Sequence, residues 1–120
     1  MKIGFIGLGN VGSKLSGSLL RNGFDVSVYD LSSQLMVDFA KKGAKIGENP
    51  EHLMNVCDTI ITCLPSPAAS NMVMQTMLPF VKEGKTWLEM STTDDAEVKR
   101  LGAEVISRGG KAVDCPVSGG

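Results

Sequence analysis

The chain has 120 residues, of which 42% are hydrophobic and 21% are charged, and its formal net charge is −1. This length is enough for one domain with its own core and short for a two-domain enzyme. The near balance of charge, without any basic run, excludes the general attraction of a basic protein to nucleic acid or to an anionic membrane. We also expect no secretory signal and no membrane-spanning helix, because the N-terminus enters a strand-like run at once and no apolar stretch approaches roughly 20 residues.

The first segments of the chain predict a strand, a glycine-rich turn, a helix and a second strand. Residues 2–6 form a short apolar run that suits a buried strand. A helical pattern of apolar residues then repeats at Val11, Leu15 and Leu19. The second strand-like run covers 26–29 and ends at Asp30. The turn between the first strand and the helix consists of Gly7, Leu8, Gly9, Asn10, Val11 and Gly12.

Each glycine of this turn has its own mechanical reason if the turn holds a dinucleotide. Gly7 allows the tight turn, Gly9 lets the backbone approach a pyrophosphate, and Gly12 lets the helix pack against the strand. The helix then presents free N–H groups and the positive end of its dipole to the phosphates. Asp30 follows at close to the expected spacing of about 20 residues, where a carboxylate can accept both ribose hydroxyls of an adenosine.

The rest of the chain continues to alternate strands and helices, without internal repeats. Strand-like segments are expected at 44–46, 59–64, 86–90 and 111–114. Helices are expected at 33–42 with Leu35, Met36, Phe39 and Ala40 inward, from Pro50 over a short stretch, at 67–78, and from the cap Asp94 to Gly109. The seven methionines, several of them between Met72 and Met77, are interpreted as core filling. His52, the only histidine, is expected on the solvent face of the short helix.

Six strands alternating with helices predict the α/β class, as an open, doubly wound parallel sheet of the Rossmann type. In such a sheet, ligands bind beyond the carboxyl ends of the strands, near the point where the strand order reverses. This rule selects residues 7–12, 30–32, 64–67 and 91–93 as the site. The residues at 91–93 are also suitable simply as caps of the helix that follows them.

The three cysteines are interpreted as reduced, buried and non-catalytic thiols. Cys57, Cys63 and Cys115 are odd in number, widely spaced and set among apolar neighbours. We therefore expect a cytoplasmic protein, with an organelle matrix as the alternative compartment. No acid pair or metal-ligand cluster stands at a usable spacing, so we expect neither a metal site nor a catalytic carboxylate pair.

Four motifs in order resemble the signature of the β-hydroxyacid dehydrogenases, whose familiar members include 3-hydroxyisobutyrate dehydrogenases and tartronate semialdehyde reductases. The resemblance covers the chain from end to end. It departs at Val11, where the family usually has methionine, at Met90, where serine is common, and at Cys115, where alanine is usual. The matching residues are 5–10 with Gly12, Leu64-Pro65-Ser66, Ser91-Thr92, and 114–120.

The resemblance implies roles for individual residues. The loop 7–12 would hold the pyrophosphate, Leu64 and Pro65 would contact the cofactor, and Thr92 would lie near the nicotinamide. Ser118, Gly119 and Gly120 match the stretch that binds the substrate carboxylate, and successive small residues do expose backbone N–H groups that can cradle an anion.

The family's proton-transferring lysine lies on a later segment, and no lysine of this chain matches it. The chain is therefore expected to be the cofactor-binding domain of a longer NAD-dependent oxidoreductase, to lack the helical second domain, and to be inactive by itself. Its substrate would be a small 3-hydroxy acid or the corresponding semialdehyde. Association into a homo-oligomer is expected only for the full-length protein, with no nucleic-acid or membrane partner.

Charge favours NAD over NADP. A 2′-phosphate would lie close to the Asp30 carboxylate, and like charges about 4 Å apart cost on the order of 4 kcal/mol at an effective dielectric of 20. No arginine follows at 31–33 to receive such a phosphate. Three alternatives stay open: a non-catalytic dinucleotide-binding module, an NADPH-dependent semialdehyde reductase of the same family, and, less favoured, a methyltransferase on a similar sheet.

Overall fold

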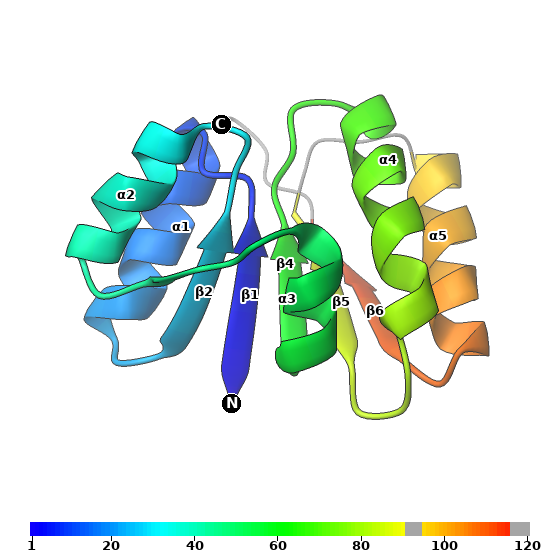
Figure 1. Cartoon of the computed structure of the whole chain (residues 1–120). Helices are drawn as coiled ribbons and strands as arrows, with labels where there is room; N and C mark the ends of the chain where they lie inside the picture. The colour runs from blue at the N-terminus through cyan, green and yellow to red at the C-terminus, as the bar shows by residue number, and fades with distance from the viewer. Residues whose placement is uncertain (91–94, 116–120) are drawn as a thin grey trace.

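The elements alternate along the chain as the sequence predicts. A computed structural model of the protein describes residues 1–90 and 95–115 (Figure 1). Its strands are β1 (Lys2–Ile6), β2 (Asp25–Tyr29), β3 (Lys45–Ile46), β4 (Thr59–Thr62), β5 (Thr86–Glu89) and β6 (Lys111–Asp114). Its helices are α1 (Asn10–Arg21), α2 (Ser33–Lys41), α3 (Pro50–Val56), α4 (Pro67–Met77), the 3₁₀ turn η1 (Leu78–Phe80) and α5 (Asp95–Ser107).

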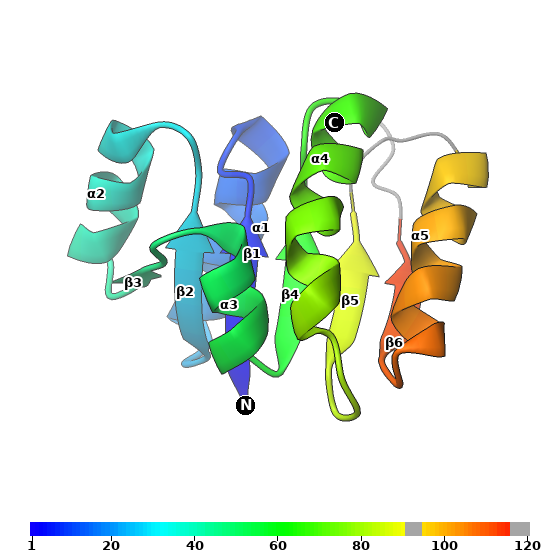
Figure 2. The same cartoon turned by 45° about the vertical axis from the view of Figure 1, so that its right-hand side comes forward.

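The six strands of the described residues form one parallel sheet. Their order is β3-β2-β1-β4-β5-β6, so the chain winds outward from β1 in one direction and then from β4 in the other. All five neighbouring pairs are parallel, and Figure 2 shows the arrowheads at the same end of the molecule. This arrangement confirms the predicted doubly wound α/β fold, and it places the reversal of strand order between β1 and β4.

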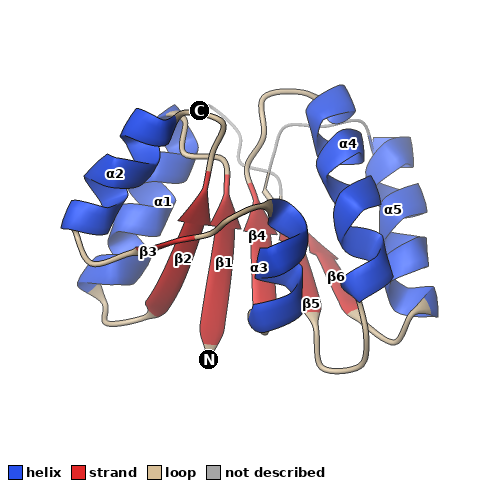
Figure 3. Ribbon diagram, viewed as in Figure 1, coloured by secondary structure: helices blue, strands red, loops and turns tan. Residues whose placement is uncertain are grey.

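Helices cover the two faces of the sheet unequally. α1 and α2 lie together on one side of the strands, and α3, α4 and α5 lie on the other (Figures 1 and 3). One row of paired residues runs across the face that α1 and α2 cover, and it consists of Phe5, Val28, Ile61, Leu88 and Val113. Phe5 and Val28 are fully buried there, whereas Val113 is 43% exposed. The row becomes exposed towards β6 because α1 and α2 pack mainly against β1, β2 and β3.

The opposite face holds the larger core. Trp87 on β5 and Leu101 on α5 are buried in it, and the Trp87 indole donates a hydrogen bond to Thr62 Oγ1 at 2.9 Å. Lys85 is also buried at this face, where its Nζ donates to the carbonyls of Asn55 and Cys57 at the end of α3, at 3.0 and 2.7 Å. Desolvation lowers the pKa of Lys85 below its usual value. Its ammonium group donates hydrogen bonds to carbonyls at the end of α3 that have no partner within the helix.

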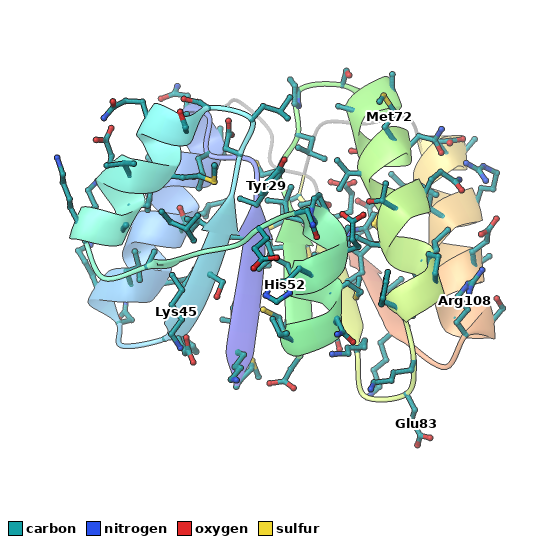
Figure 4. All side chains as sticks on the ribbon, viewed as in Figure 1. Tyr29, Lys45, His52, Met72, Glu83 and Arg108 are labelled. Carbon is teal, nitrogen blue, oxygen red and sulfur yellow. The ribbon has the colours of Figure 1, made fainter. Side chains whose placement is uncertain are left out.

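Some local expectations from the sequence need correction. Ala40 is exposed rather than inward, because it follows the buried Phe39 by one position and therefore points about 100° away around the helix. β4 ends at Thr62 instead of residue 64, and Pro65, which has no N–H, cannot extend the ladder. The predicted cap Asp94 lies outside the described residues. His52 is exposed on α3, as expected (Figure 4).

The cysteines differ from one another more than the sequence suggested. All three are free; Cys57 is buried, Cys63 is half-buried and Cys115 is exposed. Cys115 directly follows β6, the strand at the margin of the sheet. The expectation of three buried thiols is therefore wrong for Cys115 and only partly right for Cys63.

The described residues contain neither a candidate membrane span nor a candidate metal cluster. None of the helices described is both long and apolar enough to cross a bilayer. Within 1–90 and 95–115, no group of three or more histidine, cysteine, aspartate or glutamate side chains is placed to hold a metal ion.

Candidate dinucleotide-binding site

A cavity of about 750 Å³ opens beyond the carboxyl ends of the strands. This volume falls within the range of ordinary ligand sites, roughly 300 to 1,000 Å³. Its walls include the loop after β1, Asp30 after β2, Leu64 and Pro65 after β4, and the first turns of α4. These segments are far apart in the sequence and meet at the reversal of strand order, as the fold predicts.

Gly7 makes the turn that opens this cavity. Its φ of +103° lies in the left-handed region, which side chains of L-residues rarely adopt. A Cβ at this position would stand 2.1 Å from the carbonyl oxygen of Cys63. The Gly7 N–H donates to the Tyr29 carbonyl at 3.0 Å, so the turn is attached to the end of β2.

Gly9 and Gly12 serve different purposes in the same loop. A Cβ on Gly12 would lie 2.0 Å from the Gly7 carbonyl oxygen and 3.3 Å from the Phe5 ring, so α1 approaches β1 at the distance that only glycine permits. A Cβ on Gly9 would meet nothing within 4 Å, and Gly9 lines the cavity. The backbone at Gly9 is therefore open to a ligand, whereas the Cβ position of Gly12 is directed at protein atoms.

The N-terminus of α1 has no side-chain cap, in contrast to those of α2, α3 and α4. Side chains accept a hydrogen bond from the first turn of α2 at Ser32, of α3 at Asn49 and of α4 at Ser66. α1 begins after Gly9, which provides no side-chain cap, and its first turn contains no acidic residue. Its leading N–H groups and the positive end of its dipole are thus available to an anion in the cavity, which Asn10, Val11 and Gly12 line.

Asp30 lies half-buried in the cavity wall at the end of β2. Its Oδ2 accepts a hydrogen bond from the Leu8 N–H at 2.8 Å, and its Oδ1 accepts one from the Ser32 N–H at 2.8 Å. A carboxylate offers about four acceptor positions, so two of them remain for hydroxyl groups of a ligand. The sequence predicted the position of Asp30 but not these two backbone partners.

The opposite walls of the cavity are apolar. Leu31 follows Asp30 and is 93% exposed, and Met72 projects from α4 with 71% exposure. Figure 4 shows Met72 near the N-terminal end of α4 and Tyr29 at the end of β2. Leu64 and Pro65, which the sequence selected, also line the cavity. The cavity therefore combines an anion-accepting loop with surfaces that suit a flat, apolar ring.

Several lining residues were missed by reasoning from the sequence. Met72 was interpreted as core filling, but it lies off the stripe of Met74 and Met77, which are both fully buried. Helical spacing was the signal that could have separated them, since positions two apart on a helix face different directions. Tyr29 also lines the cavity, and its place directly before Asp30 could have indicated this, whereas Leu31 falls within the selected range 30–32.

Cys63 is a further residue of the cavity wall, and it carries a thiol. It is half-buried and lines the cavity. Burial, and secondarily the charge of Glu89, raises the pKa of the Cys63 thiol above its usual value. A thiol with a raised pKa is a poor nucleophile, so Cys63 is better suited to packing than to covalent chemistry.

Some residues that the sequence assigned to the site cannot be placed. Thr92, the candidate for the nicotinamide end, lies outside the described residues. The same holds for Ser118, Gly119 and Gly120, which were assigned to the substrate carboxylate. Of the residues selected from the sequence, the structure places Asp30, Leu64, Pro65, Gly7 and residues 9–12 in the cavity wall. Leu8 is buried and does not line the cavity.

The doubly wound sheet, the uncapped helix after a glycine turn and the acid at the end of β2 define a dinucleotide-binding α/β domain. The family model described as the NAD binding domain of 6-phosphogluconate dehydrogenase matches residues 2–120. The chain belongs to this family. Its cofactor is accordingly NAD, and the resemblance to the β-hydroxyacid dehydrogenases is confirmed.

Individual relatives include both named enzymes and a nuclear factor. The mitochondrial 3-hydroxyisobutyrate dehydrogenase of Rattus norvegicus is 35% identical over 121 residues, which cover 98% of this chain and 36% of the relative. The cytokine-like nuclear factor N-PAC of Homo sapiens is 36% identical over 121 residues, covering 98% of this chain and 22% of N-PAC. The structure of Mycobacterium tuberculosis 3-hydroxyisobutyrate dehydrogenase with L-serine aligns with a TM-score of 0.90 at 28% identity, over 99% of this chain and 41% of that one.

The chain thus spans well under half the length of these relatives.

Proposed function

We propose that this chain is the cofactor-binding part of an NAD-dependent oxidoreductase that acts on a small 3-hydroxy acid or its semialdehyde. The observation that carries the proposal is the convergence of the uncapped α1 N-terminus, the open backbone at Gly9 and the Asp30 carboxylate on one cavity. The loop 7–12 would hold the diphosphate, and the two acceptor positions left on Asp30 would take the hydroxyls of the adenosine ribose. Leu64 and Pro65 would also contact the cofactor.

Titration with both dinucleotides tests this proposal. By calorimetry we expect NAD to bind saturably with one site per chain, and NADP to bind at least about tenfold more weakly, a difference of roughly 1.4 kcal/mol. The weakening follows from repulsion between the 2′-phosphate and the Asp30 carboxylate, which faces the cavity beside Leu31 rather than beside a cation. Tighter binding of NADP would support the NADPH-dependent alternative instead, and tighter binding of S-adenosylmethionine than of NAD would support a methyltransferase.

The exposed apolar side chains Leu31 and Met72 provide a second test of the binding mode. We propose that they flank the adenine ring, which would cover much of their exposed surface. Replacing either one, as Leu31→Ser or Met72→Ser, is expected to weaken NAD binding by about three- to tenfold, because each variant loses roughly 1 kcal/mol of apolar contact. Ile106→Ser on α5 is the matched control, since Ile106 is 61% exposed and does not line the cavity. Equal losses in all three variants would contradict the placement of adenine between Leu31 and Met72.

The chemical step would require groups that the described residues do not supply. NAD accepts the hydride when bound, and the hydroxyl proton must pass to a base. Among the described residues, the titratable side chains that line the cavity are Tyr29, Asp30 and Cys63, and Asp30 is already assigned to the ribose. We therefore propose that the proton-accepting lysine belongs to a further helical domain of the complete protein, through which homo-oligomers would also form. Thr92 would lie near the nicotinamide, and residues 118–120 would bind the substrate carboxylate.

A non-catalytic dinucleotide-binding module is the second candidate function. It is favoured by the relatives named N-PAC, which are described as nuclear factors and match this chain at up to 36% identity. Both candidates require the same cavity and the same NAD titration. They differ in whether a protein containing this domain oxidises 3-hydroxyisobutyrate, and a matching lysine in its remaining sequence would favour the enzyme.

A further inference from the structure

The Asp30 carboxylate is already engaged in the protein before any ligand binds. Its two oxygens accept hydrogen bonds from the Leu8 and Ser32 N–H groups, each at 2.8 Å. Leu8 belongs to the glycine loop and lies 22 positions before Asp30, whereas Ser32 lies only two positions after it. One side chain therefore joins the loop after β1 to the loop after β2.

The hydrogen bond between Leu8 and Asp30 acts together with a neighbouring backbone hydrogen bond. The Gly7 N–H donates to the Tyr29 carbonyl at 3.0 Å, and the next N–H along the chain, that of Leu8, donates to Asp30. Two successive amides are thus held by the end of β2. Hydrogen bonds to an ionised acceptor are stronger than neutral ones, so the bond at Leu8 is the firmer restraint on the path of the loop towards Gly9 and α1.

We propose that Asp30 is a positioning residue for the diphosphate-binding loop, in addition to its role at the ribose. It holds Leu8, and through it the open backbone at Gly9 and the uncapped N-terminus of α1, in the arrangement that receives the diphosphate. The same carboxylate would then link recognition of the sugar to recognition of the phosphates. This inference deepens the proposed function and, for its binding measurement, rests on it.

The positioning effect and simple electrostatics predict opposite results for a ligand without ribose hydroxyls. A carboxylate repels a nearby diphosphate, so removal of its charge alone would tighten the binding of such a ligand. Loss of the bond to Leu8 would instead loosen the loop and weaken binding. The sign of the change therefore separates the two effects.

Hydrogen exchange of the free protein tests the first part of the inference. In the wild-type protein, the Leu8 amide is expected to exchange slowly. In Asp30→Asn it should exchange about tenfold faster, because the two charged acceptor oxygens are replaced by a single neutral one and an NH2 group that cannot accept. The matched control is Asp38→Asn on α2, which removes the same charge from a side chain bonded to Gln34 at 2.9 Å. Rapid Leu8 exchange in the wild-type protein would overturn the proposal without the need for any variant, including the case in which Asp30→Asn fails to fold.

Binding of 2′,3′-dideoxyadenosine diphosphate tests the second part, because this probe has no ribose hydroxyls for Asp30 to read. We expect Asp30→Asn to bind it about fivefold more weakly than the wild-type protein and Asp38→Asn do, an effect of the size that one charge-assisted hydrogen bond can produce. Unchanged or tighter binding in Asp30→Asn would overturn the positioning role. If the wild-type protein binds neither this probe nor NAD, the proposed function fails, and hydrogen exchange at Leu8 then decides the inference separately.

Discussion

Replacement of Gly12 by alanine should destabilise the fold by about 3 kcal/mol or more. The added Cβ would lie 2.0 Å from the Gly7 carbonyl oxygen, a backbone atom that cannot rotate away. Either α1 must move from β1 or the loop at Gly7 must change its path, and both changes disturb the buried contact with Phe5. Urea denaturation followed by circular dichroism would measure the loss.

The control for this substitution lies in the same helix. Gly17 is also buried in α1, but a Cβ there would approach only the Arg21 side chain, at 3.3 Å, which is flexible. Gly17→Ala is therefore expected to leave the stability unchanged or to raise it by roughly 0.5 to 1 kcal/mol, as alanine does in a helix interior. A Gly12→Ala variant as stable as Gly17→Ala would contradict the close approach of α1 to β1.

Replacement of Gly9 by alanine should have the opposite effects: the stability of the fold should be kept, and the affinity for NAD should fall. Its φ of −69° is open to alanine, and its Cβ would meet no atom of the protein within 4 Å. Stability should therefore stay within about 0.5 kcal/mol of the wild-type value. Because Gly9 lines the cavity, the new methyl group would occupy the space into which a diphosphate must come, and NAD binding should weaken by at least about tenfold.

Thermal melting and NAD calorimetry on the same Gly9→Ala preparation would separate these effects. Gly17→Ala serves again as the reference, since Gly17 does not line the cavity and its NAD affinity should equal that of the wild-type protein. Undiminished NAD binding by Gly9→Ala would mean that the diphosphate does not approach this loop, and the proposed site would have to be moved.

Much of the fold could be predicted because local patterns and tertiary packing agree in this chain. The almost continuously apolar run at 59–64 contains the strand β4, Thr59–Thr62, as a strand between two helical layers requires. On α5, the three buried residues Val98, Leu101 and Val105 recur at helical spacing, as one face of an amphipathic helix does. The glycines at 7, 9 and 12 and Asp30 were identified because each is tied to one local geometric need.

The parts that could not be predicted depend on contacts between distant segments. Nothing near Met72 in the sequence shows that its side chain lines the same cavity as Leu31, because the turn after β2 and helix α4 meet only once the sheet has formed. The bond from Leu8 to Asp30 spans 22 positions and depends on the same event. The burial of Lys85 also escaped prediction, since its partners are backbone carbonyls at the end of α3, which the side-chain pattern does not reveal.

The outermost strands of the sheet differ from its centre in a way that bears on self-association. Within the described residues, β3 has two residues and carries Lys45, and β6 has four, with Lys111 and Asp114 at its ends. A short border strand with charged ends is a poor template for a strand from another molecule. Both margins are therefore protected against edge-to-edge aggregation, although the apolar strands between them would be prone to it if they were left bare.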